Sequence, residues 1–189
     1  MAEEKIEEDN KELNSIDGNS IFIHGIFDET ISKNIIPKLI KEIDIQEKIK
    51  EGRLKFYINS RGGYAHMLLD LLALIEIAKK KGIIVETYVF AYAYSCGSLL
   101  ACSGSKGHRY ISYNAEHLCH LGSASTGDVI NDTELERSME RVQAHFDRVR
   151  SLYKKYANVI DLEEAIKNDN YFLRGQTIID NGLADNYVD

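Results

Sequence analysis

A serine lies where an apolar stretch gives way to small residues, and its surroundings suit a nucleophile. Ser95 follows the β-prone stretch 83–90 and precedes the helix-tolerant stretch 99–102. We therefore expect a strand-to-helix junction, where the hydroxyl is exposed and the N–H groups of the first helical turn point outward. A nucleophilic serine needs both, because the attacked carbonyl develops an oxyanion. The same motif also fits a buried serine that caps a helix.

A second segment upstream ends in two adjacent glycines. The stretch 54–60 has the pattern of a buried strand, and it runs through Arg61 into Gly62 and Gly63. A glycine pair lets a backbone N–H approach a ligand without interference from a Cβ atom. Gly-Gly is used more often as a simple turn between a strand and a helix, so this segment alone leaves both interpretations open.

Together the two segments resemble the proteolytic subunit of Clp protease (ClpP) and its phage-encoded relatives. That family has a Tyr-Ile-Asn-Ser-Pro-Gly-Gly-like turn after a core strand, and residues 57–63 read Tyr-Ile-Asn-Ser-Arg-Gly-Gly. Its nucleophile lies in an Ala-Ser-Met-Gly-like elbow, and residues 94–97 read Tyr-Ser-Cys-Gly. Further matching segments are 20–28, 106–111, 168–173 and 180–185. The resemblance therefore covers nearly the whole chain.

The resemblance implies a Ser-His-Asp triad formed by Ser95, His120 and Asp169. In such a triad the imidazole takes the serine proton as general base, and the carboxylate holds the imidazole and stabilises its charged form. The implied oxyanion donors are the backbone N–H groups of Gly63 and Cys96. The activity implied is that of a serine endopeptidase acting on unfolded or extended polypeptides inside a self-assembled ring.

Two side chains near the triad are rivals for its roles. His117 lies three residues before His120 on an expected strand, so it should face the opposite side, and we expect a surface or packing histidine. The thiol of Cys96 adjoins the nucleophile, but no positional argument favours it over Ser95. The remaining histidines have no partner that the sequence can name.

An extended substrate is expected to pair its backbone with two segments that border the site. One segment carries Gly62 and Tyr64, and the other carries Ser123, Ala124 and Ser125. Backbone pairing gives affinity with little sequence preference. This mode of binding suits an enzyme that is supplied with unfolded chains.

Strands and helices are expected to alternate along the chain. The expected strands are 20–25, 54–59, 83–90, 109–112 and one that ends near 120, and the expected helices are 29–50 and 64–81. Repeated βα units imply a mainly parallel sheet covered by helices. This α/β layout agrees with the ClpP/crotonase-like fold of ββα units that the resemblance implies.

A long amphipathic helix is expected over about 131–157, with Asp132 as its cap. In the family this helix belongs to a protruding handle, here about 122–157, that interdigitates between two stacked rings. From its spacing alone the helix could equally pack on its own core.

Composition fits one globular domain over 20–189 with an acidic N-terminal arm over 1–19. The chain has 189 residues, of which 44% are hydrophobic and 28% charged. Its net charge of −7 argues against nucleic acid as the main partner. We expect the arm to be mobile. It either gates or docks at the axial entrance of a ring, or it is an unstructured tail.

The cysteine content, the apolar runs and the absence of a nucleotide-binding motif indicate the cellular compartment and the cofactors to expect. Three cysteines without a C-x-x-C pair favour reduced thiols, hence the cytoplasm, or the host cytoplasm for a phage-encoded protein. No apolar run is long enough for a membrane helix. We expect no metal or other cofactor. The chain lacks a Gly-x-x-x-x-Gly-Lys motif, so any ATP would be used by a separate chain, an AAA+ unfoldase.

Three departures from the family pattern leave alternatives open. Arg61 stands where the family has proline, Leu121-Gly122 where it has Gln-Pro, and Asn168 where an arginine couples ring assembly to an active triad. The resemblance implies a ring that is a heptamer or a stacked double heptamer, and the missing arginine leaves a single ring or another stoichiometry open. A remote, phage-encoded member with a role in capsid maturation is one hypothesis. The competing functions are a catalytically silent ring subunit and a crotonase-like acyl-CoA enzyme, which shares the fold but needs no triad.

Overall fold

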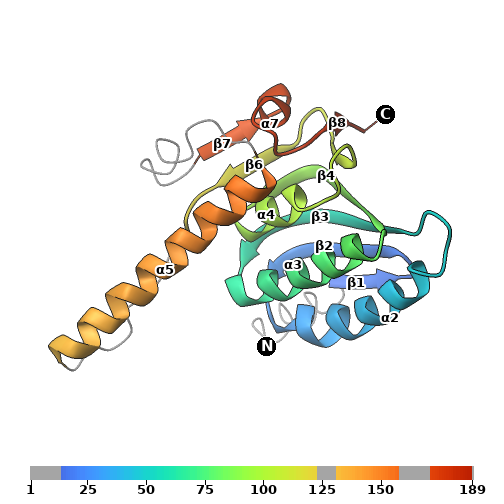
Figure 1. Cartoon of the computed structure of the whole chain (residues 1–189). Coiled ribbons are helices and arrows are strands. Elements are labelled where there is room, and N and C mark those ends of the chain that lie inside the picture. The colour runs from blue at the N-terminus through green and yellow to red at the C-terminus, as the bar shows by residue number, and fades with distance from the viewer. Residues whose placement is uncertain (1–13, 123–130, 158–170, 189) are drawn as a thin grey trace, which may run out of the picture.

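A computed structural model describes residues 14–122, 131–157 and 171–188, and a mainly parallel β-sheet organises them (Figure 1). The strands are β1 (Asn14–Asp17), β2 (Ser20–Phe27), β3 (Arg53–Gly63), β4 (Ile84–Tyr94), β5 (Arg109–Ile111), β6 (Glu116–Cys119), β7 (Tyr171–Arg174) and β8 (Asn186–Tyr187). The helices are a π-helical turn η1 (Ile31–Ile35), α2 (Ile36–Gln46), α3 (Ala65–Lys80), α4 (Cys96–Cys102), α5 (Asp132–Tyr156) and α7 (Gln176–Asp180). The predicted α/β class with a mainly parallel sheet is confirmed.

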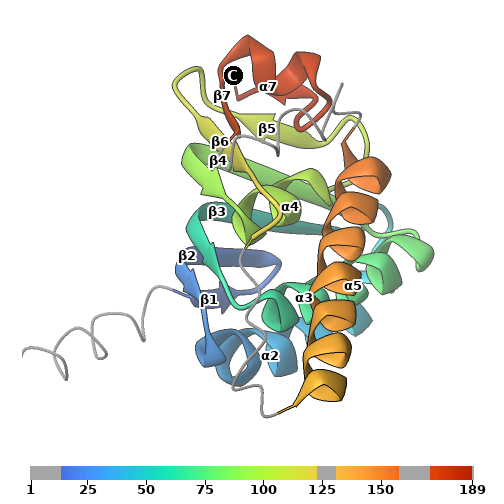
Figure 2. The same cartoon turned by 90° about the vertical axis from the view of Figure 1, so that its left-hand side faces the viewer.

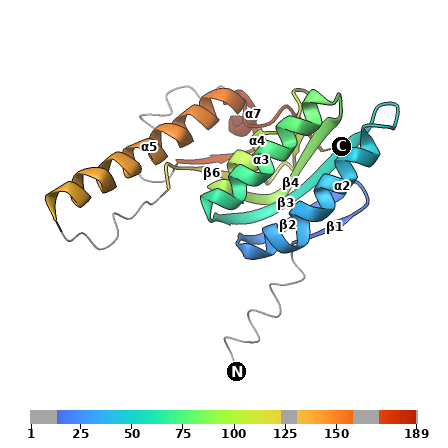
Figure 3. The same cartoon turned by 60° about the horizontal axis from the view of Figure 1, so that its bottom comes forward.

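The strand order across the sheet is β1-β2-β3-β4-β5-β8, and β6 pairs with both β4 and β7. Only β1 with β2 and β6 with β7 are antiparallel among these pairs. Figures 2 and 3 show α2 and α3 lying over one face of the sheet. Parallel strands connected through helices bring the carboxyl ends of β3 and β4 to the same edge, and these ends carry the two motifs described above.

The core forms because each element has apolar residues at its own period. In β3 the alternate residues Leu54, Phe56 and Ile58 are buried, as expected for a strand with one face against helices. In α3 the buried residues follow helical spacing, and they are Met67, Leu68, Leu71, Leu72, Ile75 and Ala78. The strand and the helix that flank the Gly-Gly segment are thus both held by the core.

A row of aromatic rings crosses four neighbouring parallel strands in register. Phe22, Tyr57, Tyr88 and Tyr110 stack with centroid separations of 5.1, 5.1 and 5.0 Å. Aromatic cross-strand pairs each contribute about 0.2–1 kcal/mol to sheet stability. The row therefore fixes the relative register of β3 and β4, which position the two motifs.

Several element boundaries differ from the sequence expectation. β3 continues to Gly63 and β4 to Tyr94, because these ends pair with Phe27 of β2 and Leu118 of β6. The segment Asn14–Asp17, expected within the arm 1–19, forms β1. The buried Asn14 side chain receives the N–H of His24 and donates to the Ile26 carbonyl, which ties the segment to β2. Residues 1–13 lie outside the described ranges.

The helix α5 covers the expected range, but the prediction that Asp132 caps it is wrong. Asn131 is the cap: its backbone is extended and its side-chain oxygen accepts the N–H of Glu134 at 3.0 Å. Asp132 is the first residue inside the helix, where its charge complements the helix dipole. Figures 1 and 3 show α5 projecting beyond the sheet. Leu135 and Met139, in the N-terminal half of the helix, are exposed.

A buried arginine fastens the C-terminal segment to the rest of the fold. Arg109 is 2% exposed and forms a two-point ion pair with Asp185, with N···O distances of 2.8 and 2.6 Å. The same guanidinium donates to the carbonyls of Cys102, Tyr156 and Gly182. One side chain therefore joins the ends of α4 and α5 to the segment that leads into β8.

No helix within the described ranges has the length and apolar character required to span a bilayer.

Candidate active site

Ser95 forms a sharp elbow between β4 and α4. Its backbone angles, φ 55° and ψ −118°, are strained for a residue with a side chain, and Glu51 is the other non-glycine residue of the described ranges with positive φ. Such a conformation costs about 1–3 kcal/mol and persists only where the surroundings hold it. Here the Ser95 N–H donates to the Leu118 carbonyl at 2.9 Å, and the Ser95 carbonyl accepts the N–H of Leu99.

The elbow rests directly on the glycine turn at the end of β3. A Cβ atom added to Gly62 would lie 2.7 Å from the Ser95 Cβ and 3.2 Å from the Cys96 nitrogen. A Cβ on Gly97 would lie 2.9 Å from the Ser60 carbonyl oxygen. These approaches require glycine on both sides of the contact. The Gly-Gly segment therefore packs directly against the Ser95 elbow.

Hydrogen bonds fix the end of β3 beneath the elbow. The Ser60 hydroxyl donates to the Gly25 carbonyl at 2.6 Å and accepts the N–H of Gly62 at 3.1 Å. The Gly62 N–H is thus engaged inside the protein, and Gly62 is buried and paired with Ile26 of β2. Gly63 lies so close to Phe27 that a Cβ there would be 2.5 Å from the Phe27 carbonyl oxygen.

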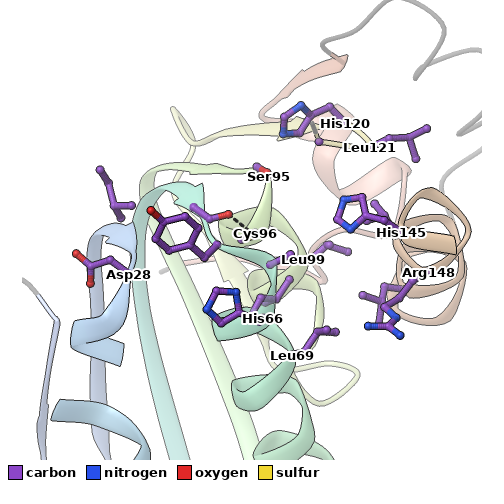
Figure 4. Close-up of a pocket in the computed structure, with 18 residues that line it drawn as sticks. Asp28, His66, Leu69, Ser95, Cys96, Leu99, His120, Leu121, His145 and Arg148 are labelled. Atoms are coloured by element: carbon purple, nitrogen blue, oxygen red, sulfur yellow. Dashed lines mark hydrogen bonds between the residues drawn. The ribbon is translucent and has the colours of Figure 1, made fainter. Parts of the chain in front are cut away.

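The two predicted oxyanion donors, Gly63 and Cys96, lie next to each other. The Cys96 thiol donates to the Gly63 carbonyl at 3.4 Å, as the dashed line in Figure 4 marks. Burial raises the pKa of this thiol. A protonated, hydrogen-bonded thiol is a poor nucleophile, which supports the choice of Ser95 over Cys96.

His120 reaches the site from β6. Because Tyr94 pairs with Leu118, the residues that follow each strand, Ser95 and His120, emerge at the same edge of the sheet. Both side chains line one cavity of about 900 Å³ (Figure 4). Gly63, Tyr64 and Cys96 line it too. Of the other predicted site residues, Asp169 and the segment Ser123–Ala124–Ser125 lie outside the described residues.

The cavity has a wall that the sequence analysis missed. The inner half of α5 contributes His145, Arg148, Val149 and Leu152 to the lining. Figure 4 shows His145 and Arg148 across the cavity from Leu69 of α3. The 3–4 spacing of apolar residues in α5 indicated that one face is buried, but the pattern could not say against which element. Within the described ranges, no three His, Cys, Asp or Glu side chains are arranged to hold a metal ion.

A second polar group lies behind the elbow, inside the core. The Ser98 hydroxyl is 3.1 Å from His117 Nδ1 and 3.5 Å from the Cys119 sulfur, and all three side chains are fully buried. Burial, helped by the nearby Arg109 charge, lowers the pKa of His117 to about 3, so this imidazole is neutral. His117 is thus a packing histidine, one of the two alternatives expected for it, and it does not line the cavity.

Comparison with known proteins gives a consistent family. The family model described as Clp protease matches residues 5–189. The ATP-dependent Clp protease proteolytic subunit of Streptococcus sanguinis is 27% identical over 174 residues, which are 89% of this chain and 84% of that protein. The subunit of the same name from Streptococcus mutans is 30% identical over 122 residues, 65% of this chain and 59% of that protein. The one from Streptococcus uberis is 30% identical over 115 residues, 61% of this chain and 56% of that protein.

Proposed function

Because this chain belongs to the Clp protease family of serine-type peptidases, we propose that it cleaves extended polypeptides with a triad of Ser95, His120 and Asp169. The observation that carries the proposal is the strained elbow at Ser95, which opens on the same cavity as His120. Strain of this kind is retained where function requires a side chain to be presented. Neither a silent subunit nor an acyl-CoA enzyme needs a serine held in this way.

The reaction follows from the groups that border the cavity. The Ser95 oxygen attacks the peptide carbonyl while His120 takes the hydroxyl proton, and a C–O bond forms. His120 then returns the proton to the leaving amine as the C–N bond breaks. Water repeats the sequence on the ester, releasing the new carboxyl terminus and restoring Ser95. Asp169 holds the imidazole and stabilises its charged form in this scheme.

The N–H groups of Gly63 and Cys96 stabilise the oxyanion in this proposal. Its support is the contact between the glycine turn and the elbow, which keeps the two peptide groups adjacent before any substrate arrives. Donors held in place need no rearrangement during the reaction, and one such donor is worth about 2.7–4 kcal/mol in other hydrolases.

Substrate binding is proposed to combine backbone pairing with an apolar cavity. Tyr64 and the segment Ser123–Ala124–Ser125 are the proposed pairing sites. Leu69, Leu121, Val149 and Leu152 supply apolar walls from three parts of the chain. Pairing through the backbone admits many sequences, and the cavity then favours an apolar side chain beside the cleaved bond.

We further propose that the active form is a ring of identical chains. The outer half of α5 carries Leu135 and Met139, which are 41% and 60% exposed in the single chain. Both belong to the apolar stripe that is buried farther along the helix at Val149 and Tyr153. A second copy would cover this stripe. The relatives are named ATP-dependent, and from this we propose that an AAA+ partner supplies unfolded substrate.

The proposal is tested with a polypeptide that is already unfolded and therefore needs no ATPase partner to unfold it. Reduced, carboxymethylated α-lactalbumin carrying a fluorescent label is incubated with the wild type, Ser95→Ala and Ser15→Ala. Ser15 is an exposed serine of β1, so its variant is the matched control. We expect Ser95→Ala to lose on the order of a thousandfold in rate and Ser15→Ala to keep it. Equal rates in the wild type and Ser95→Ala would contradict the proposal.

A further inference from the structure

Three buried polar side chains behind the elbow have no role in the mechanism above. Ser98, His117 and Cys119 are each 0% exposed, and the Ser98 hydroxyl lies 3.1 Å from His117 Nδ1 and 3.5 Å from the Cys119 sulfur. Burying polar groups in an apolar core costs free energy unless they are hydrogen-bonded there. An arrangement of this kind can be retained because it fixes one geometry, since hydrogen bonds are directional and apolar contacts are not.

The positions of these side chains relate them to the nucleophile and the base. Ser98 lies one helical turn after Ser95 on α4. His117 and Cys119 are alternate residues of β6, so both face α4, and Cys119 directly precedes His120. The Ser98 hydroxyl of α4 therefore contacts two successive inward-facing residues of β6, and His120 directly follows the second of them.

We propose that Ser98 is a positioning residue that aligns His120 with Ser95 through its contacts with His117 and Cys119, an inference that rests on the proposed function. The backbone supplies a first link, from the Ser95 N–H to the Leu118 carbonyl at 2.9 Å. The Ser98 cluster supplies the second. β6 is already paired with β4 along Tyr92–Glu116, Ala93–His117 and Tyr94–Leu118, so the register of β6 is fixed by the sheet. The two links from α4 then set how this helix, with Ser95 at its start, is oriented against that strand.

The hydrogen atoms of the cluster are consistent with a directional chain. His117 is neutral, so one ring nitrogen carries a hydrogen and the other does not. If Nδ1–H donates to the Ser98 oxygen, the Ser98 O–H is free to donate to the Cys119 sulfur. His117 Nε2, which has no hydrogen-bond partner among the described residues, is then an acceptor and leaves no buried N–H unpaired. Tyr153 of α5, also fully buried, packs against Ser98 and Cys119.

The test compares two buried serines of the same helix. Ser98→Ala removes the link to β6, and Ser103→Ala is the matched control. Ser103 is also 0% exposed, but its hydroxyl donates to the Leu100 carbonyl at the far end of α4 and does not touch β6. For each variant we would measure the second-order rate of labelling by a fluorophosphonate and the stability in urea. Labelling reports the alignment of the serine and its base without requiring the natural substrate.

We expect similar losses of stability in both variants but a labelling rate lowered about tenfold or more in Ser98→Ala alone, since small misplacements of reacting groups are costly. Equal labelling by the two variants would overturn the inference. If Ser98→Ala does not fold, Cys119→Ala removes one of the two contacts, and a labelling rate equal to that of Ser103→Ala would overturn it in the same way.

A failure of the proposed function gives a different result, since the wild type itself would then not be labelled. The inference is still decided in that case by amide hydrogen exchange at the Ser95 N–H, which reports the link between the elbow and β6. Exchange at this site is expected to be faster in Ser98→Ala than in Ser103→Ala. Identical exchange in the two variants would overturn the inference whether or not the protein is an active peptidase.

Discussion

Replacing Gly62 by alanine tests whether the glycine turn supports the elbow at Ser95. The added Cβ would lie 2.7 Å from the Ser95 Cβ and 3.0 Å from the Tyr94 carbonyl oxygen. Crowding of this kind costs about 1–3 kcal/mol. The φ angle of Gly62 is +95°, which adds about 1–2 kcal/mol for any residue with a side chain. We therefore expect Gly62→Ala to lose about 2–5 kcal/mol in the free energy of unfolding.

Gly82 separates the two causes of that loss. Its φ angle is +80°, close to that of Gly62, but nothing lies within 4 Å of a Cβ added there. Gly82→Ala should therefore show only the backbone cost of about 1–2 kcal/mol. The difference between the free energies of unfolding of the two variants, measured in urea, is the cost of the steric contact between the added Cβ and the Ser95 elbow.

Chemistry at Ser95 should be more sensitive than stability to the same change. The alanine can be accommodated only if the elbow or the turn moves by several tenths of an ångström, and a displacement near 1 Å can cost about a hundredfold in rate. We expect fluorophosphonate labelling of folded Gly62→Ala to be slowed to about that extent, and labelling of Gly82→Ala to match the wild type. If Gly62→Ala is labelled at the wild-type rate and unfolds no more easily than Gly82→Ala, the glycine turn does not support the Ser95 elbow.

Three further predictions concern other parts of the fold. Arg109→Ala should cost about 3–5 kcal/mol in urea unfolding, because it leaves Asp185 without its buried partner; a loss below about 1 kcal/mol would contradict this. Burial lowers the pKa of His117 to about 3 from an ordinary 6.5, so as pH falls below 6.5 the unfolded state takes up the proton first and stability is lost. The free energy of unfolding of the wild type should therefore fall by about 1.4 kcal/mol per pH unit relative to His117→Val between pH 6 and pH 4, and parallel pH curves would contradict it. Finally, Met139→Asp should weaken self-association, as analytical ultracentrifugation would show, whereas unchanged assembly would exclude the outer half of α5 as a contact surface.

The sequence predicted those features of the fold that depend on local patterns. The alternating β3 and the helical spacing of α3 are carried by residues close together in the chain, and both elements were found where expected. The segments around Ser95 and Gly63 were predicted to form one site, and the contact between Gly62 and Ser95 brings them together.

What the sequence could not predict depends on contacts between distant segments. The ends of β3 and β4 extend beyond their apolar patterns, because pairing with β2 and β6 continues the strands. The cap of α5 is Asn131 and not Asp132. Either side chain can accept an N–H at the start of a helix, so the local sequence does not distinguish the two adjacent positions. The wall that α5 contributes to the cavity, and the meeting of Ser98 with His117, arise only when the helices pack.

Whether Ser95 is an activated nucleophile is decided by locating the adduct of a fluorophosphonate by peptide mass spectrometry. We expect a single major adduct on Ser95 in the wild type, its absence in Ser95→Ala, and strongly reduced labelling in His120→Ala. An adduct on a different residue, labelling that persists in Ser95→Ala, or a folded wild-type protein that is not labelled would show that Ser95 is not the nucleophile.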